Sequence, residues 1–148
     1  MNLIFRKLDA NNICDLKQFN ELMGVLAKPA DSLDVLVANI EKANIQENYY
    51  LMVVEDTEAS RLCGSLLAIT FDDYCGDCRP LMVVENVVTH PDYQKLGIGR
   101  RMFEEIEAWG KTRNVNYALL CSDMNREGAH KFYRAIGCTE VKGFKKYL

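Results

Sequence analysis

The chain has 148 residues, of which 49% are hydrophobic and 26% are charged, and its formal net charge is −3. This length suits one domain, residues 1–148, with its own hydrophobic core and an ordinary globular composition. The negative charge argues against a broad nucleic-acid or anionic-membrane surface. No apolar run could span a membrane and no signal-peptide core begins the chain, so we expect a cytoplasmic location.

Apolar residues in the first half of the chain recur at two different spacings. Two segments show the helical spacing, and three apolar, β-branched or aromatic runs predict strands. Pro29 ends the first helix, and Ser32 or Asp31 caps the second. The predicted elements are a strand at 3–8, a helix at 11–24, a helix carrying Leu33 to Ile40, and a hairpin of strands 49–55 and 62–71.

The second half alternates strands and helices. Its predicted elements are a strand at 81–88, a helix from a glycine loop to about residue 112, a strand at 116–121, a helix at 127–136 that Gly137 ends, and one or two strands at 138–141 and 144–147. The order predicts an α/β (α+β three-layer) domain. Its mixed, mostly antiparallel central sheet has six to seven strands, flanked by about four helices.

Six cysteines divide into two groups. Cys14, Cys63, Cys121 and Cys138 lie in apolar patterns, where a reduced thiol acts as a small core residue. The segment Cys75-Gly76-Asp77-Cys78 is half of a zinc site or a redox pair by spacing alone. No second pair completes four zinc ligands, and the acidic surroundings disfavour a reactive thiolate. We therefore expect a polar loop there and no bound metal.

The most informative segment is a buried strand followed by Gln94-Lys95-Leu96-Gly97-Ile98-Gly99 at the start of a helix. The first turn of a helix leaves backbone N–H groups unpaired, and the helix dipole adds positive charge there. Glycines allow an anion to approach the backbone, although they could also simply make a tight turn. Gln94 and the two arginines at 100 and 101 favour a phosphate or pyrophosphate site.

Two common nucleotide loops do not match this segment. A Walker loop requires Gly-Lys-Ser/Thr, whereas Arg100 and Arg101 follow Gly99. A dinucleotide fingerprint requires a third glycine near position 102, which is Met102. The sequence thus indicates an anion site of another kind.

Two motifs in residues 81–148 resemble those of the GCN5-related N-acetyltransferase superfamily. The first, Gln94 to Gly99, matches Gln/Arg-x-x-Gly-x-Gly/Ala. The second motif of that family is Asn…Ala…Phe-Tyr…Gly-Phe, and the matching residues here are Asn125, Ala129, Phe132, Tyr133 and Gly137, with Cys138 in place of the final Phe. Two motifs in the expected order on strand–helix units are far more specific than either alone.

This resemblance implies acetyl-CoA as the cosubstrate. Backbone N–H groups from Leu96 to Arg101 would hold its pyrophosphate. The strand ending at Val87-Val88-Thr89 would bond its pantetheine arm, beside a bulge that splays this strand from the next. The implied cofactor-binding residues are Val87, Val88, Thr89, Gln94, Leu96, Gly97, Ile98, Gly99, Arg100, Arg101, Asn125 and Phe132.

Acetyl transfer to an amine requires a proton acceptor, stabilisation of the carbonyl oxygen and a proton for the thiolate. The family position gives Tyr133 as the general acid, against simple packing with Phe132, and gives the Val88 N–H as the oxyanion donor. Glu85 interrupts an apolar strand. It is the candidate base or amine orienter, against a carboxylate that merely faces water.

The resemblance predicts direct acetyl transfer to a primary amine of a small molecule or a protein, and a homodimer. The alternatives are a non-catalytic acyl-CoA sensor on the same fold, and a redox or metal module based on Cys75 and Cys78. The acidic residues Asp72, Asp73 and Asp77 favour a cationic acceptor, although such loop tips are usually just solvated.

Overall fold

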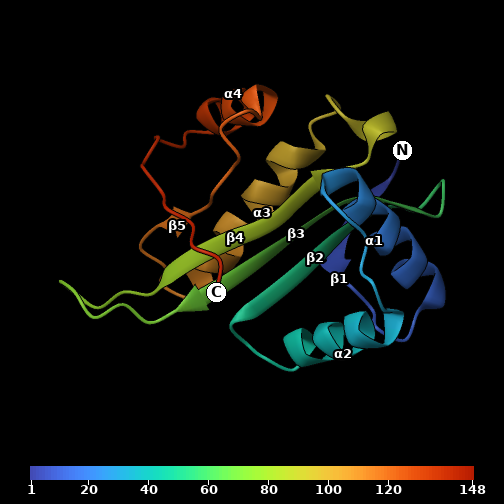
Figure 1. Ribbon diagram of the computed structural model, residues 1–148, viewed down its shortest axis with the longest axis horizontal. Coiled ribbons are helices and arrows are strands. Elements are labelled where there is room, and N and C mark those ends of the chain that lie inside the picture. The colour runs from blue at the N-terminus through green and yellow to red at the C-terminus, as the bar shows by residue number, and fades with distance from the viewer.

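Five strands form one mixed sheet in the computed structural model, which describes all 148 residues (Figure 1). The strand order follows the chain; the first four strands are antiparallel, and β5 pairs in parallel with β4. The elements are β1 (Leu3–Lys7), α1 (Ile13–Leu26), α2 (Leu33–Asn44), β2 (Tyr49–Asp56), β3 (Arg61–Phe71), β4 (Leu81–Thr89), the 3-10 turn η1 (Pro91–Tyr93), α3 (Ile98–Thr112), β5 (Ala118–Leu119) and α4 (Glu127–Ala135).

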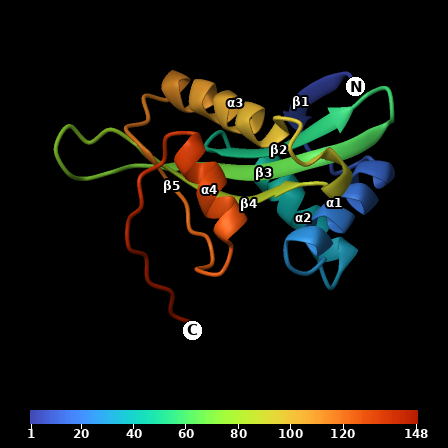
Figure 2. The ribbon, with the colours of Figure 1, turned by 90° about the horizontal axis from the view of Figure 1, so that it is seen from above.

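Helices cover both faces of the sheet, so alternate residues of the central strands enter two different cores. Figure 2 shows α3 on one side of the sheet and α1 and α2 on the other. In β2, Met52 and Val54 join the core under α3, and Leu51 and Val53 join the core under α1 and α2. Burial on both faces explains why this strand is a continuous apolar run.

The helix ends follow local capping chemistry. The Asn12 side chain accepts from the N–H groups of Cys14 and Asp15, so α1 starts at Ile13, two residues after the predicted start. Ser32 caps α2 as predicted. Beyond α4, Gly137 has a φ of +96°, and the Cys138 N–H donates to the Tyr133 carbonyl. This glycine C-cap confirms the predicted end of the helix.

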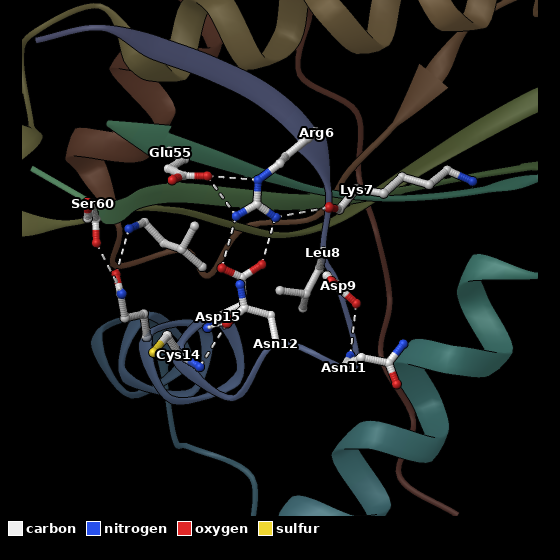
Figure 3. Close-up of polar contacts among 12 residues, drawn as sticks. Arg6, Lys7, Leu8, Asp9, Asn11, Asn12, Cys14, Asp15, Glu55 and Ser60 are labelled. Carbon is white, nitrogen blue, oxygen red and sulfur yellow. Dashed lines mark hydrogen bonds and ion pairs between the residues drawn. The ribbon is translucent and has the colours of Figure 1, made fainter. Parts of the chain in front are cut away.

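An ion cluster fastens α1 to the first two strands (Figure 3). The Arg6 guanidinium donates to both oxygens of Asp15, at 2.6 and 2.9 Å, and to Glu55 at 2.9 Å. Asp15 is buried, and these hydrogen bonds raise the pKa of Arg6, with its burial acting against them. Such a bidentate pair fixes the direction in which α1 leaves β1.

The prediction of six to seven strands is wrong, because residues 138–148 form no strand. Apart from the N–H of Cys138, no backbone group of this segment makes a hydrogen bond. The side chains of Val141, Phe144 and Tyr147 are exposed. β5, the neighbouring sheet edge, contains only two residues and offers too short a ladder for another strand.

Three of the four cysteines expected in the core are not buried. Only Cys63 is buried, with its thiol donating to the Val54 carbonyl at 3.4 Å. Cys14 and Cys121 are exposed and Cys138 is half-buried, because Cys14 lies in the first turn of α1 and the other two lie just beyond β5 and α4, where apolar periodicity no longer implies burial. No helix combines the length and the apolar content needed to cross a bilayer.

Candidate functional site

Strand β4 contains the bulge that the sequence resemblance implies. Glu85 pairs with Leu67, whereas Val88 pairs with Ser65, so β4 has one residue more than β3 between these pairs. The extra residue leaves Asn86 with a φ of +53°. A bulge bends its strand and breaks the regular alternation of the backbone groups.

Beyond this bulge, one edge of β4 has no neighbouring strand. β5 pairs only with Met82 and Val83, and the strands are not paired further on. We call the backbone of residues 84–89 on this side the open edge. A strand edge without a partner presents free N–H and C=O groups, and an extended amide chain can bond to them as an added strand does.

The bulge decides which residues face the open edge. The Val88 carbonyl lies 3.4 Å from the Cβ position of Gly64 in β3, and the His90 N–H donates to the Cys63 carbonyl in the same strand. Because backbone direction alternates along a strand, Val87 and Thr89 face the open edge. The expectation that the Val88 N–H reaches the substrate is therefore wrong: it faces β3.

The segment after β4 presents unpaired N–H groups at the start of α3. No backbone N–H from Lys95 to Arg100 donates a hydrogen bond, and the first helical bond runs from the Arg101 N–H to the Gly97 carbonyl. Gly97 has a φ of +81° and open space where a Cβ would stand. These N–H groups and the helix dipole suit a pyrophosphate, and no side chain fills the space over Gly97.

The neighbouring polar side chains hold this segment in place. Arg100 donates to the Ala135 carbonyl at the end of α4, at 3.2 Å, and the Arg101 guanidinium lies 4.7 Å from the centre of the Phe5 ring. The Gln94 amide lies 3.4 Å from the Thr89 carbonyl. The two arginines thus connect α3 to α4 and β1, and the backbone N–H groups are the groups left unpaired at the start of α3.

Helix α4 packs against the beginning of α3 through aromatic rings. A Cβ on Gly99 would lie 3.1 Å from the Phe132 ring, so this glycine permits close packing of the two helices. Phe103 contacts both Phe132 and Tyr133, with ring centres 5.8 and 5.9 Å apart. For Gly99 the sequence indicated an anion site or a tight turn and not this packing, because the contact joins residues 33 positions apart.

Tyr133 and Glu85 lie within electrostatic reach of each other. Tyr133 is half-buried, and its pKa is raised by burial first and also by the charges of Cys138 and Glu85, with Arg126 acting against them. Glu85 is exposed and makes no ion pair. Its cross-strand partner Leu67 packs on the α1–α2 core, so Glu85 lies on that face and Tyr133 on the α3 face.

Other polar residues considered from the sequence take different places. Asn125 is exposed in the loop before α4 and its side chain makes no hydrogen bond within the chain. His130 contacts the Asp123 carbonyl, and His90 contacts Arg61 at 2.8 Å. Cys75 and Cys78 are exposed in the long loop between β3 and β4, and no three His, Cys, Asp or Glu side chains are grouped to hold a metal ion.

With this geometry in place, comparison with known proteins gives one consistent family. The model of the acetyltransferase (GNAT) family matches residues 17–138. The chain is 24% identical over 131 residues to the uncharacterised N-acetyltransferase YhdJ of Bacillus subtilis, covering 86% of this chain and 85% of that protein. It is 28% identical over 85 residues to glucosamine 6-phosphate N-acetyltransferase of Schizosaccharomyces pombe, covering 57% of this chain and 77% of that protein.

Solved structures show the same fold. Glucosamine-6-phosphate N-acetyltransferase from Arabidopsis thaliana superposes with a TM-score of 0.85 at 17% identity, covering 99% of each chain. AAC(6')-Iy, in complex with the bisubstrate analogue CoA-S-monomethyl-acetylneamine, superposes with a TM-score of 0.81 at 17% identity, covering 100% of this chain and 98% of that one. At such identities the likeness concerns the fold alone.

Proposed function

This chain belongs to the acetyltransferase (GNAT) family, and from that premise we propose that it transfers an acetyl group from acetyl-CoA directly to a primary amine. The observation that carries the proposal is the continuity of two features. The open edge of β4 leads straight into the unpaired N–H groups of Lys95 to Arg100. An amide-containing arm that ends in a pyrophosphate matches both.

The binding residues follow from the direction of each group. The Val87 carbonyl and the backbone groups of Thr89 would bond the pantetheine amides. The N–H groups of Leu96, Gly97, Ile98, Gly99 and Arg100 would surround the pyrophosphate, with Gln94 and Arg101 beside them. Asn125 and Phe132 would border the arm on the α4 side. Neither edge nor loop requires a metal for these contacts, and we propose none.

The reaction requires three functions that this chain can supply. Glu85 would accept the proton of the attacking ammonium group, directly or through a water molecule. The Val87 N–H, which faces the open edge, would stabilise the carbonyl oxygen in the role first given to Val88. Tyr133 would donate its proton to the departing thiolate, and its raised pKa keeps the phenol protonated at neutral pH.

The acceptor is proposed from the names of the similar proteins and from charge. Two of the proteins described above are named for acetylation of an amino sugar phosphate. A cationic amine would also approach the uncompensated carboxylate of Glu85 favourably. We therefore place amino sugars first among the candidate acceptors, and small polyamines and lysine peptides after them.

A thiol-release assay with acetyl-CoA and these three groups of amines tests the proposal. We expect CoA release that depends on the presence of one acceptor group. The alternative is a sensor that binds acyl-CoA without turning it over. CoA binding with no release above the hydrolysis rate for every amine would support that sensor and overturn the enzymatic proposal.

A further inference from the structure

The segment that presents the unpaired N–H groups is held from outside by a buried carboxylate. Asp56, the last residue of β2, is 5% exposed. One of its oxygens accepts from the N–H groups of Asn2 and Glu58, at 3.1 and 3.3 Å, and the other accepts from the Tyr93 hydroxyl at 3.2 Å. The N-terminus, the turn after β2 and η1 therefore all bond to this side chain.

Tyr93 connects this carboxylate to the proposed pyrophosphate segment. It is the last residue of η1 and directly precedes Gln94. Its ring packs on the core under α3 and against the edge of His90, with ring centres 5.9 Å apart. Burial raises the pKa of Asp56, but the hydrogen bonds from Asn2, Tyr93 and Glu58 outweigh it and lower this pKa overall, so the carboxylate is charged at neutral pH.

The backbone that follows Tyr93 shows why this hydrogen bond matters. Lys95 and Gly97 both have positive φ values, +64° and +81°, and none of the N–H groups from Lys95 to Arg100 is bonded within the chain. No backbone hydrogen bond from these N–H groups therefore holds the shape of the segment, which depends on side-chain contacts: the buried Ile98 within it, and Tyr93 just before it. A ligand that had to order these groups on binding would lose part of its binding free energy.

We infer that Tyr93 and Asp56 are positioning residues, which set the affinity for the nucleotide end of acetyl-CoA without touching it. This inference rests on the proposed function, since it concerns the same substrate. The hydrogen bond fixes η1 against the end of β2, and η1 in turn fixes the N–H groups that follow. This hydrogen bond should therefore affect the affinity only of ligands that bind to those N–H groups.

The test compares two acetyl donors, acetyl-CoA and S-acetylpantetheine, which lacks the pyrophosphate and the nucleotide. Tyr93→Phe removes only the hydroxyl. We expect the KM for acetyl-CoA and the Kd for CoA to rise about tenfold, because a hydrogen bond to a charged group is among the stronger ones. We expect kcat with acetyl-CoA, and kcat/KM with S-acetylpantetheine, to stay within about twofold of wild type.

Tyr50→Phe is the matched control. Tyr50 packs against Trp109 with ring centres 5.6 Å apart, in the far half of α3, and its hydroxyl makes no hydrogen bond. This variant should bind CoA as wild type does. Unchanged CoA affinity in Tyr93→Phe, or an equal loss with both donors, would overturn the inference while leaving the proposed function intact. A wild-type protein that fails to bind CoA would overturn the proposed function itself.

Discussion

At the scale of single residues, Tyr133 is proposed as the general acid on the basis of its burial and its raised pKa. It is half-buried beside Phe103, and burial is the first cause of its raised pKa. Tyr133→Phe keeps the ring packing and removes the proton. We expect kcat to fall by about 10²- to 10⁴-fold, the usual worth of a positioned acid, with the Kd for CoA unchanged. Steady-state kinetics and calorimetry measure the two quantities, and an unchanged kcat would exclude the acid role.

The charge of Glu85 makes a second prediction about the same phenol. A raised pKa keeps Tyr133 protonated to higher pH than free tyrosine, and Glu85 is one of the charges that raise it. Glu85→Gln removes this charge, so Tyr133 should ionise at lower pH than in wild type. Phenolate absorbance, taken as the difference between each protein and its Tyr133→Phe form, follows the titration. An identical midpoint would mean that the two side chains do not interact.

The sequence predicts those parts of the candidate site that belong to short local motifs. Gln94 to Gly99 and Tyr133 belong to such motifs; the first lies at the start of α3 and the second on the helix packed against it. Val88 was assigned wrongly because the bulge inserts one residue and exchanges which backbone groups face the open edge. Asp56 and Tyr93 were missed because their contact joins residues 37 positions apart.

At the scale of elements, the contact between α3 and α4 depends on the absent side chain of Gly99. A methyl group there would lie 3.1 and 3.2 Å from atoms of the Phe132 ring, so in Gly99→Ala this ring must move by a few tenths of an ångström, and we expect the neighbouring Tyr133 to shift with it. We expect turnover to fall at least tenfold. Alanine has the better helix propensity, by about 1 kcal/mol, but the crowding against Phe132 should offset most of this gain in stability.

Gly128→Ala provides the matched control for this change. Gly128 lies in α4 with nothing within 4 Å of its Cβ position. The substitution should raise the free energy of unfolding by about 0.5 kcal/mol and leave turnover unchanged. Urea denaturation and steady-state kinetics of the pair separate packing from propensity. Equal turnover in the two variants would show that α4 does not depend on Gly99 for its position.

The ion cluster of Arg6 predicts a large loss of stability. Arg6→Ala leaves the carboxylate of Asp15, whose side chain is 6% exposed, without its cation. Breaking such a buried pair costs about 3 kcal/mol of unfolding free energy. Lys28→Ala removes an ion pair to Asp31 that is largely exposed, and should cost less than about 0.5 kcal/mol. Chemical denaturation measures both, and similar losses would contradict the structural role of the cluster.

Elements were predicted best where periodicity and capping agree. The helix at 98–112 and the strands at 49–56 and 81–89 lie within two residues of their predicted bounds, and the helix at 33–44 contains the residues predicted to form it. The strands expected at 138–141 and 144–147 are absent, because an alternating apolar segment becomes a strand only when a neighbouring strand pairs with it. Sequence alone does not show that β5 is two residues long.

At the scale of the whole molecule, the sheet brings the two halves of the chain together around the proposed binding site. The end of β2, η1 and the start of α3 support the proposed pyrophosphate segment, and β4 and α4 carry Glu85 and Tyr133. A ligand that bridges these elements should stabilise the entire fold. At CoA concentrations about 100-fold above Kd we expect about 2.7 kcal/mol of added stability, or about 5–10 °C in Tm.

Differential scanning calorimetry with CoA, and with pantetheine at the same concentration, checks this prediction. Pantetheine lacks the groups that would bind Lys95 to Arg100, so its effect should be smaller. Equal shifts in Tm with both ligands would show that the N–H groups before α3 contribute nothing to binding.

The central claim is that this chain moves an acetyl group directly from acetyl-CoA to an amine. Mass spectrometry after incubation with isotopically labelled acetyl-CoA tests it, with and without the amine that gives most thiol release. We predict one labelled amide on the acceptor for each CoA released, and an unlabelled protein when the acceptor is omitted. Label on the protein itself would contradict direct transfer. A protein that binds CoA but leaves the label in acetyl-CoA with every amine would contradict the account as a whole.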